Sequence, residues 1–283
     1  MAEIDLHDVI NIENYTLSDN PDNVSIKIIN NGGESSSILK DIPTEKNLIT
    51  IAVKKYLSLI KKGGDFTFSI IKNIPSGAGL GGGSSNAAAA LKIVSELFGR
   101  GIDNYVIEAS AGTGSDVTFF LNGGFSFVEG KGEQISPIEI YNNSYILLVN
   151  NGIHINTGEA YNSLKRKIST VGAASCVGAA TCRPHKINSI NKKREIEAQI
   201  NTISTWKDIF RNDFEAVIFN QYPQIGLIKE KMYENGAIFA QMSGSGSSIF
   251  GVFNDKNSAN NLKKTLEKQG NRVYYTKFHH NIN

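Results

Sequence analysis

Alternating apolar and polar residues predict strands in the first seventy residues. The segments with this period of two are residues 9–14 (VINIEN), 24–30 (VSIKIIN) and 65–71 (DFTFSII). Residues 45–64 instead carry apolar side chains at helical spacing, with lysines in the last turn and Gly63 as a stop signal. The third strand leads into a glycine-rich stretch, and the alanine-rich segment after it predicts a helix over about residues 84–97.

A second block of elements follows. Residues 113–124 (TGSDVTFFLNGG) form a Gly/Ser/Asp turn that runs into an apolar segment. Strands are expected at residues 124–130 and 144–150, and helices at about 157–165, 194–220 and 223–236. The end reads strand, glycine turn, strand, helix, strand, at residues 237–241, 242–246, 247–253, 258–270 and 272–278. Residues 169–193 show little periodicity and are expected to form an exposed loop.

This order of elements predicts two α+β domains. We place them at residues 1–143 and 144–283. A length of 283 residues with 40% apolar side chains is ample for a buried core.

Composition excludes several classes of protein. A net charge of +2 is too small to indicate nucleic-acid binding. No segment approaches the run of about 18 apolar residues that spans a membrane, and the N-terminus lacks the pattern of a signal or transit peptide. Cys176 and Cys182 do not form a disulfide framework, so we expect a cytoplasmic protein. With His185 they make a poor zinc motif, because only three candidate ligands are present.

The stretch PSGAGLGGGSSNAAAAL (residues 75–91) carries the strongest chemical signal. Five of the seven residues 77–83 are glycine, and a helix follows at once. Bare backbone N–H groups and the positive end of a helix favour an anion such as phosphate. A tight turn is the plainer alternative, and a dinucleotide-binding G-x-G-x-x-G pattern with Asp103 about 20 residues on is another. A Walker loop is excluded, because Gly83 stands where that loop needs lysine.

The whole stretch resembles the phosphate-binding loop of the GHMP kinases, named for galactokinase, homoserine kinase, mevalonate kinase and phosphomevalonate kinase. Two further motifs agree with that family in the right order: GSDVTFFLNGG at residues 114–124 and MSGSGSSIFGVF at residues 242–253. The shorter runs RNDFE and NTGEAY also lie where the family has similar ones. The resemblance covers nearly everything from residue 4 to residue 277 except residues 169–193.

The resemblance implies a two-domain α+β fold, with a ribosomal protein S5 domain 2-like N-terminal domain and a ferredoxin-like C-terminal domain. It also implies an ATP- and Mg²⁺-dependent kinase of a cytidine-diphosphate-linked polyol in the non-mevalonate isoprenoid pathway, with no nucleic-acid or membrane partner. Another small-alcohol kinase of the family, of the homoserine or mevalonate type, is an alternative. A catalytically impaired nucleotide-binding homologue is a second alternative.

The matching positions receive roles from the same resemblance. Asp116 is expected to act as the catalytic base, although a capping or turn aspartate is the structural alternative. Tyr161 is expected to stack on cytosine, against the alternative of a core tyrosine. The expected ATP-binding residues are Asn47, Pro75, Ser76, Gly77, Ala78, Gly79, Leu80, Gly81, Gly82, Gly83, Ser84, Ser85, Gly244 and Ser245, with Ser84 or Ser85 also a possible Mg²⁺ contact. The expected substrate-binding residues are Thr157, Tyr161 and Gly246.

The chain departs from the family pattern in two places. The family opens with a strand that carries Pro-Ala-Lys-x-Asn, whereas this chain begins at about the later run EIDLHD. The family lysine that pairs with the catalytic aspartate therefore has no counterpart in this sequence, and we expect ATP binding with weak phosphoryl transfer. Thr118 also stands where proline is usual.

Overall fold

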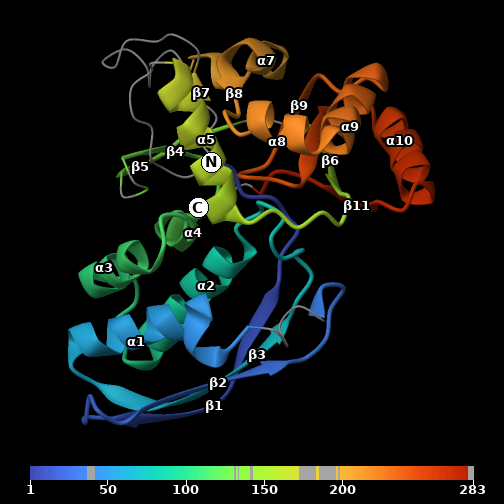
Figure 1. Cartoon of the computed structure of the whole chain (residues 1–283). Coiled ribbons are helices and arrows are strands. Elements are labelled where there is room, and N and C mark those ends of the chain that lie inside the picture. The colour runs from blue at the N-terminus through green and yellow to red at the C-terminus, as the bar shows by residue number, and fades with distance from the viewer. Residues whose placement is uncertain are drawn as a thin grey trace.

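The protein, described here from a computed structural model, consists of two α+β units stacked end to end (Figure 1). The structure describes residues 1–36, 42–130, 132, 134–140, 143–171, 183–184, 196 and 198–279. The candidate zinc ligands Cys176, Cys182 and His185 lie outside these residues. None of the helices in the described ranges combines the length and the apolar character that crossing a lipid bilayer requires.

The first unit is built on a sheet with the order β1-β3-β2. Its strands are β1 (Val9–Ser18), β2 (Val24–Asn30) and β3 (Gly63–Ile71). The central strand β3 runs antiparallel to β1 and parallel to β2. Phe66, Phe68 and Ile70 alternate along β3 and are all buried, which gives one face of the sheet its apolar surface.

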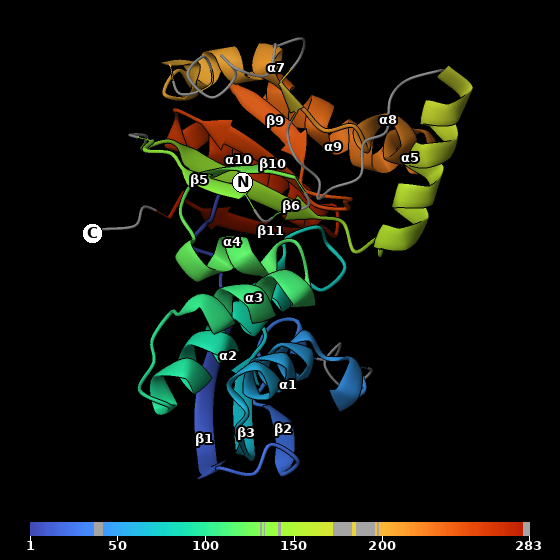
Figure 2. The same ribbon diagram turned by 90° about the vertical axis from the view of Figure 1, so that its left-hand side faces the viewer.

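Four α-helices among the described residues complete this unit. They are α1 (Leu48–Ile60), which follows the short helix η2 (Thr44–Lys46), α2 (Gly82–Leu97), α3 (Asn104–Thr113) and α4 (Val117–Asn122). Figures 1 and 2 show α1 and α2 over one face of the sheet. Val53 and Leu57 of α1 and Leu91 and Val94 of α2 are buried in one cluster with the phenylalanines of β3. This packing fixes α2, and with it the glycine-rich loop at its N-terminus.

The second unit has an antiparallel sheet with the order β11-β6-β10-β9. Its strands are β6 (Tyr145–Asn150), β9 (Phe239–Met242), β10 (Ile249–Phe253) and β11 (Arg272–Thr276). The helices α5 (Thr157–Val171), α8 (Glu215–Gln221) and α9 (Pro223–Glu234) come between β6 and β9, and α10 (Lys256–Lys268) precedes β11. This strand order and the two helical crossovers are those of a ferredoxin-like sandwich, as expected.

The two faces of that sheet carry different cores. Leu147 and Val149 of β6 pack with α8, α9 and α10, whereas the alternate residue Ile146 belongs to a second cluster. The second cluster includes Trp206 and Phe278, whose rings lie 5.9 Å apart. It is completed by α7 (Trp206–Ile209), η3 (Ile203–Thr205) and the hairpin of β4 (Ser126–Glu129) and β5 (Gln134–Pro137). Part of the expected first domain therefore packs directly against the second sheet.

Some expected boundaries were wrong. The helix α1 ends at Ile60, its C-cap Lys61 takes the left-handed conformation with φ 54°, and Gly63 begins β3 instead of stopping the helix. The single helix expected over residues 194–220 is divided into η3, α7 and α8, with the short strand β8 (Phe210–Arg211) paired to β7 (Arg183–Pro184). The elements α3 and β5 were not expected.

Candidate active site

The glycine-rich loop joins β3 to α2 and alternates its backbone conformation. Gly77, Gly79 and Gly81 have φ of 66°, 73° and 67°, in the left-handed region that favours glycine. Gly81 is also the N-cap of α2, and no side chain caps this helix. The first-turn N–H groups of α2 therefore lack a side-chain acceptor, which is the arrangement that suits an anion.

Ser84 and Ser85 lie inside the first turns of α2 and do not cap it. The Ser85 hydroxyl donates to the Gly82 carbonyl within the helix at 3.0 Å. The Ser84 hydroxyl has no hydrogen-bond partner among the residues that the structure describes. Ser84 thus has a donor that a ligand can use. The next expected contact, Asn47, does cap its helix, because its side-chain oxygen accepts from the Ile49 N–H at 3.0 Å.

The loop between β9 and β10 reaches across to the glycine-rich loop. The Ser243 hydroxyl donates to the Gly79 carbonyl at 2.8 Å, and the Ser248 N–H donates to the Ala78 carbonyl at 3.2 Å. Gly244 is in the left-handed region, with φ 57°. A Cβ atom on Gly244 would lie 2.8 Å from the Gly79 carbonyl oxygen. Two motifs separated by about 160 residues in the sequence are therefore in direct contact, as the Ser243–Gly79 separation of 164 shows.

Asn212 holds the loop between β9 and β10 in place through its side-chain amide. Its amide nitrogen donates to the Met242 and Gly244 carbonyls at 2.7 and 2.8 Å. Its side-chain oxygen accepts from the Phe214 N–H at 3.0 Å, and Glu215 accepts from the Met242 N–H at 2.8 Å. The sequence marked the run RNDFE without assigning it a role, and the structure makes it the support of this loop.

Asp116 lies at the start of α4 but does not cap it. Its backbone is helical, and its side chain makes no capping hydrogen bond. The Ser115 hydroxyl donates to its Oδ1 at 3.2 Å. Burial raises the pKa of the Asp116 carboxyl above its ordinary value of 3.8, and the Ser115 hydroxyl opposes this shift. No lysine or arginine among the described residues forms an ion pair with Asp116, and burial is the largest effect on its pKa.

The three motifs share one cavity of about 280 Å³. Its polar lining includes Asp116, Asn212 and Ser243, and Gly79, Leu80, Gly81 and Gly244 supply backbone to its wall. The rest of the lining is largely aromatic and aliphatic. A cavity lined by a buried carboxylate and by two glycine loops is the candidate active site of this chain.

Thr157 and Tyr161 lie on the first turns of α5 beside the same loops. The Thr157 and Ser245 hydroxyls are 3.2 Å apart, and Gly246 in the same loop has φ 93°. The Tyr161 ring packs edge-on against Phe214 with ring centroids 4.9 Å apart. Burial, and then the charge of Asp116, raise the pKa of the Tyr161 hydroxyl. Tyr161 is thus half-buried, and its hydroxyl is close enough to Asp116 for the charge of that carboxylate to raise its pKa.

His154 is a residue at this site that the sequence did not point to. Its ring lies against the glycine-rich loop, as a Cβ atom placed on Gly77 would be only 2.0 Å from the His154 Nδ1 atom. Thr118, at the position where proline was expected, is buried, and its hydroxyl lies 3.0 Å from that of Ser110. The dinucleotide-binding alternative is wrong: Asp103 caps α3 by accepting from the Val106 N–H at 2.9 Å.

Comparison with known proteins agrees with this architecture. Residues 47–124 match the family described as GHMP kinases N terminal domain, and residues 195–272 match GHMP kinases C terminal. The 4-diphosphocytidyl-2-C-methyl-D-erythritol kinase of Bacteroides thetaiotaomicron is 38% identical over 213 residues, which is 74% of this chain and 69% of that protein. The enzyme of the same name from Porphyromonas gingivalis is 37% identical over 222 residues, which is 76% of this chain and 72% of that protein.

Solved structures show the same fold. A crystal structure of 4-(cytidine 5'-diphospho)-2C-methyl-D-erythritol kinase has a TM-score of 0.67 and 22% identity, covering 98% of this chain and 88% of its own. A homoserine kinase from Cytophaga hutchinsonii has a TM-score of 0.66 and 18% identity, covering 94% and 87%. The fold and these matches define a small-molecule kinase. The chain belongs to the GHMP kinase family.

Proposed function

We propose that this chain transfers the γ-phosphoryl group of ATP to the 2-hydroxyl of 4-diphosphocytidyl-2-C-methyl-D-erythritol, with Mg²⁺. The observation that carries this proposal is the identity of 37–38% with enzymes of that name over about three quarters of the chain. The similarity to homoserine kinase is 18% in sequence and concerns the fold alone. The reaction belongs to the non-mevalonate isoprenoid pathway, and we place it in the cytoplasm.

The glycine-rich loop has the form that nucleotide phosphates need. Glycine is required where this loop packs against its neighbours, because a Cβ atom on Gly79 or Gly81 would lie 2.1 Å from the Ser243 carbonyl oxygen or 2.9 Å from the Phe120 ring. The uncapped N-terminus of α2 offers backbone N–H groups and a positive dipole end. These features support phosphate binding by residues 75–85, with Asn47, Gly244 and Ser245 beside it.

The donor set also fits a cation that arrives with the nucleotide. The described residues hold no cluster of three or more His, Cys, Asp or Glu side chains that could form a metal site of their own. Mg²⁺ commonly keeps several waters and shares its remaining positions between one or two protein ligands and phosphates. Ser84 or Ser85 would be such a ligand. When bound, Mg²⁺–ATP supplies the phosphoryl group and offsets part of its negative charge.

Asp116 supplies the chemistry at the acceptor side in this proposal. An ionised carboxylate can accept the proton of the substrate hydroxyl as that oxygen attacks the phosphoryl group. Ser115 orients the carboxylate by donating to Oδ1. The position of Asp116 on the same cavity wall as Gly79 and Gly81 supports this role.

Thr157, Tyr161 and Gly246 are the proposed contacts for the substrate. Tyr161→Ala should weaken binding of the cytidine substrate by about 1–3 kcal/mol, because stacking of one base on one ring has that value. ATP affinity should change little. Calorimetric titration with each ligand separately checks this prediction. Equal loss for both ligands would show that Tyr161 acts through its packing on Phe214 instead.

The function is tested by ADP release in a coupled assay with purified protein, ATP and Mg²⁺. We expect slow turnover with 4-diphosphocytidyl-2-C-methyl-D-erythritol and none above background with homoserine or mevalonate. Phosphorus NMR of the product then shows whether the new phosphate is on the 2-hydroxyl. Turnover with homoserine or mevalonate but not with the cytidine substrate would reject the proposed substrate. ATP binding without turnover on any of the three would reject the proposed activity.

A further inference from the structure

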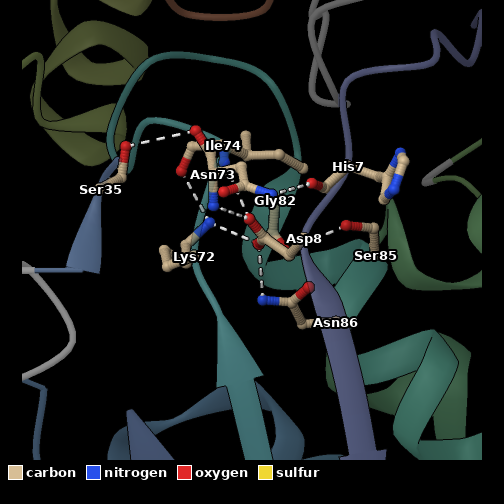
Figure 3. Close-up of polar contacts among 9 residues, drawn as sticks. All are labelled: His7, Asp8, Ser35, Lys72, Asn73, Ile74, Gly82, Ser85 and Asn86. Carbon is tan, nitrogen blue, oxygen red and sulfur yellow. Dashed lines mark hydrogen bonds and ion pairs between the residues drawn. The ribbon is translucent and has the colours of Figure 1, made fainter. Parts of the chain in front are cut away.

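A buried ion pair lies directly beneath the glycine-rich loop. The Lys72 ammonium is 2.5 Å from Oδ2 of Asp8, and the two side chains are 4% and 0% exposed. The pairing register of the sheet brings them together: Val9 of β1 faces Ile71 of β3, so Asp8 and Lys72 occupy the next positions. Figure 3 shows the two side chains meeting at the point where β3 gives way to the loop.

The Asp8 carboxylate is bonded on both oxygens. Its Oδ1 accepts from the backbone N–H groups of Asn73 and Ile74, each at 2.8 Å. Its Oδ2 accepts from Lys72 and from the side-chain amide of Asn86 at 2.9 Å (Figure 3). Asn73 and Ile74 immediately precede the loop, whereas Asn86 lies in α2 just after it. One carboxylate therefore ties the entry of the loop to its exit.

Lys72 adds a second tie at the same place. Its ammonium also donates to the Ile74 carbonyl at 2.7 Å. A Cβ atom on Gly82, the first residue of α2, would lie 3.1 Å from the Lys72 Nζ atom. Burial lowers the pKa of Lys72, and the hydrogen bond and charge of Asp8 oppose that shift. The Lys72 side chain is thus held against both ends of the loop by its contacts with Asp8 and the Ile74 carbonyl.

The stability of the fold does not by itself explain a buried ion pair at this position. A buried ion pair costs so much desolvation that well-packed apolar residues of similar volume often serve as well or better. What the polar groups provide and apolar groups cannot is a set of directed hydrogen bonds to backbone atoms on both sides of the loop. The loop itself is rich in glycine, so it has little conformational preference of its own.

We propose that Asp8, Lys72 and Asn86 form a positioning clamp that holds residues 75–83 in the conformation that binds phosphate. The clamp residues do not touch the nucleotide in this scheme. The proposal rests on the proposed function, because it concerns the nucleotide loop of that kinase. The competing scheme is that Lys72 itself contacts a phosphate oxygen.

The test compares four clamp variants and one control variant with the intact chain. Asp8→Asn keeps the shape and removes the charge, Lys72→Met removes the ammonium, and the double variant removes both. Asn86→Ala is the milder change, since it deletes one hydrogen bond without leaving a buried charge unpaired. Tyr56→Phe is the matched control, because it removes the buried hydrogen bond at 3.0 Å between Tyr56 and Ser95 in the last turn of α2.

Three measurements are made on every variant: hydrogen exchange of the loop amides, affinity for a non-hydrolysable ATP analogue, and thermal unfolding. We expect faster exchange over residues 75–83 and ATP affinity lower by about 100-fold for both single variants, the loss that follows when the binding-competent loop conformation falls to about 1% of the population. Asn86→Ala should show the same pattern to a smaller degree. The double variant should lose no more than either single variant. Tyr56→Phe should unfold at lower temperature with unchanged loop exchange and ATP affinity.

Other outcomes reject the clamp. If Lys72→Met loses ATP while Asp8→Asn keeps it and neither changes loop exchange, Lys72 is a direct phosphate contact. If all variants lose only global stability, as Tyr56→Phe does, the network is merely structural. If the unaltered chain binds no ATP, the proposed function fails, and the exchange measurement alone still decides whether the clamp orders the loop.

Discussion

Asp116→Asn should lower kcat about 10²–10⁴-fold, the usual effect of removing a general base. Asparagine has the size and shape of aspartate but cannot accept the substrate proton. Affinities for ATP and for the cytidine substrate should change much less, because the side chain still fits between Ser115 and the cavity. Single-turnover kinetics separate the chemical step from binding. Unchanged turnover in a folded Asp116→Asn variant would remove Asp116 from catalysis.

The same substitution should not lower stability at neutral pH. A raised pKa means that the folded state holds the Asp116 proton more tightly than the unfolded state does. Stability is therefore lost as the pH rises from 3.8 through the folded-state pKa, and asparagine escapes this loss. Thermal unfolding of Asp116→Asn should match the unaltered protein below that window and equal or exceed it above. The activity of the unaltered protein should rise with pH across the same window, because the ionised form is the base.

Asp255 provides the matched control. It caps α10, and hydrogen bonds from the Ser258 hydroxyl and backbone lower its pKa. Asp255→Asn should leave kcat unchanged, because asparagine is an equally good N-cap. Its pH signature has the opposite sign: the contribution of Asp255 is present above pH 3.8 and is lost as the pH falls through its folded-state pKa. A similar kcat loss in both variants would point to a general effect on the fold.

The sequence predicted the elements whose pattern is local. The strand over residues 24–30 is β2 with the same bounds, and the glycine-rich stretch does form a loop before a helix. The helix begins at Gly82 and not at Ser84, because Gly81 takes the N-cap position. The family fold and the kinase function are confirmed by the comparisons. The roles of the individual site residues, the domain division at residues 143 and 144, and the expected weak phosphoryl transfer stay predictions.

What the sequence did not predict depends on distant partners. The clamp needs Asp8 and Lys72, which are 64 residues apart and meet only through the register of β1 and β3. The expected helix over residues 194–220 is interrupted because Trp206 packs on Phe239 and Phe278, and because Phe210 joins a strand pair. In both cases tertiary contacts override or add to the local pattern.

The second large effect is expected at Gly79, where the two glycine loops meet. Gly79→Ala puts a Cβ atom 2.1 Å from the Ser243 carbonyl oxygen, a distance that requires the backbones to move apart. It also places a side chain at φ 73°, which costs about 1–2 kcal/mol for an L-residue. The hydrogen bond from Ser243 to Gly79 should be lost with this movement. We expect kcat/KM for ATP to fall by about 100-fold or more, since a displacement of about 1 Å at a reacting site has that effect.

Gly99→Ala separates the two causes of this loss. Gly99 follows α2 with φ 68°, nearly the value at Gly79, but a Cβ atom there would meet nothing within 4 Å. Its substitution should lower the free energy of unfolding by a similar backbone penalty and leave kcat/KM for ATP unchanged. Steady-state kinetics and denaturant unfolding of both variants make the comparison. If Gly79→Ala has an unchanged kcat/KM for ATP and loses as much free energy of unfolding as Gly99→Ala, contact between the two loops is not needed for nucleotide binding. If kcat/KM for ATP falls in Gly79→Ala and not in Gly99→Ala, the contact between the two loops is needed for nucleotide binding, because both variants have the same backbone penalty.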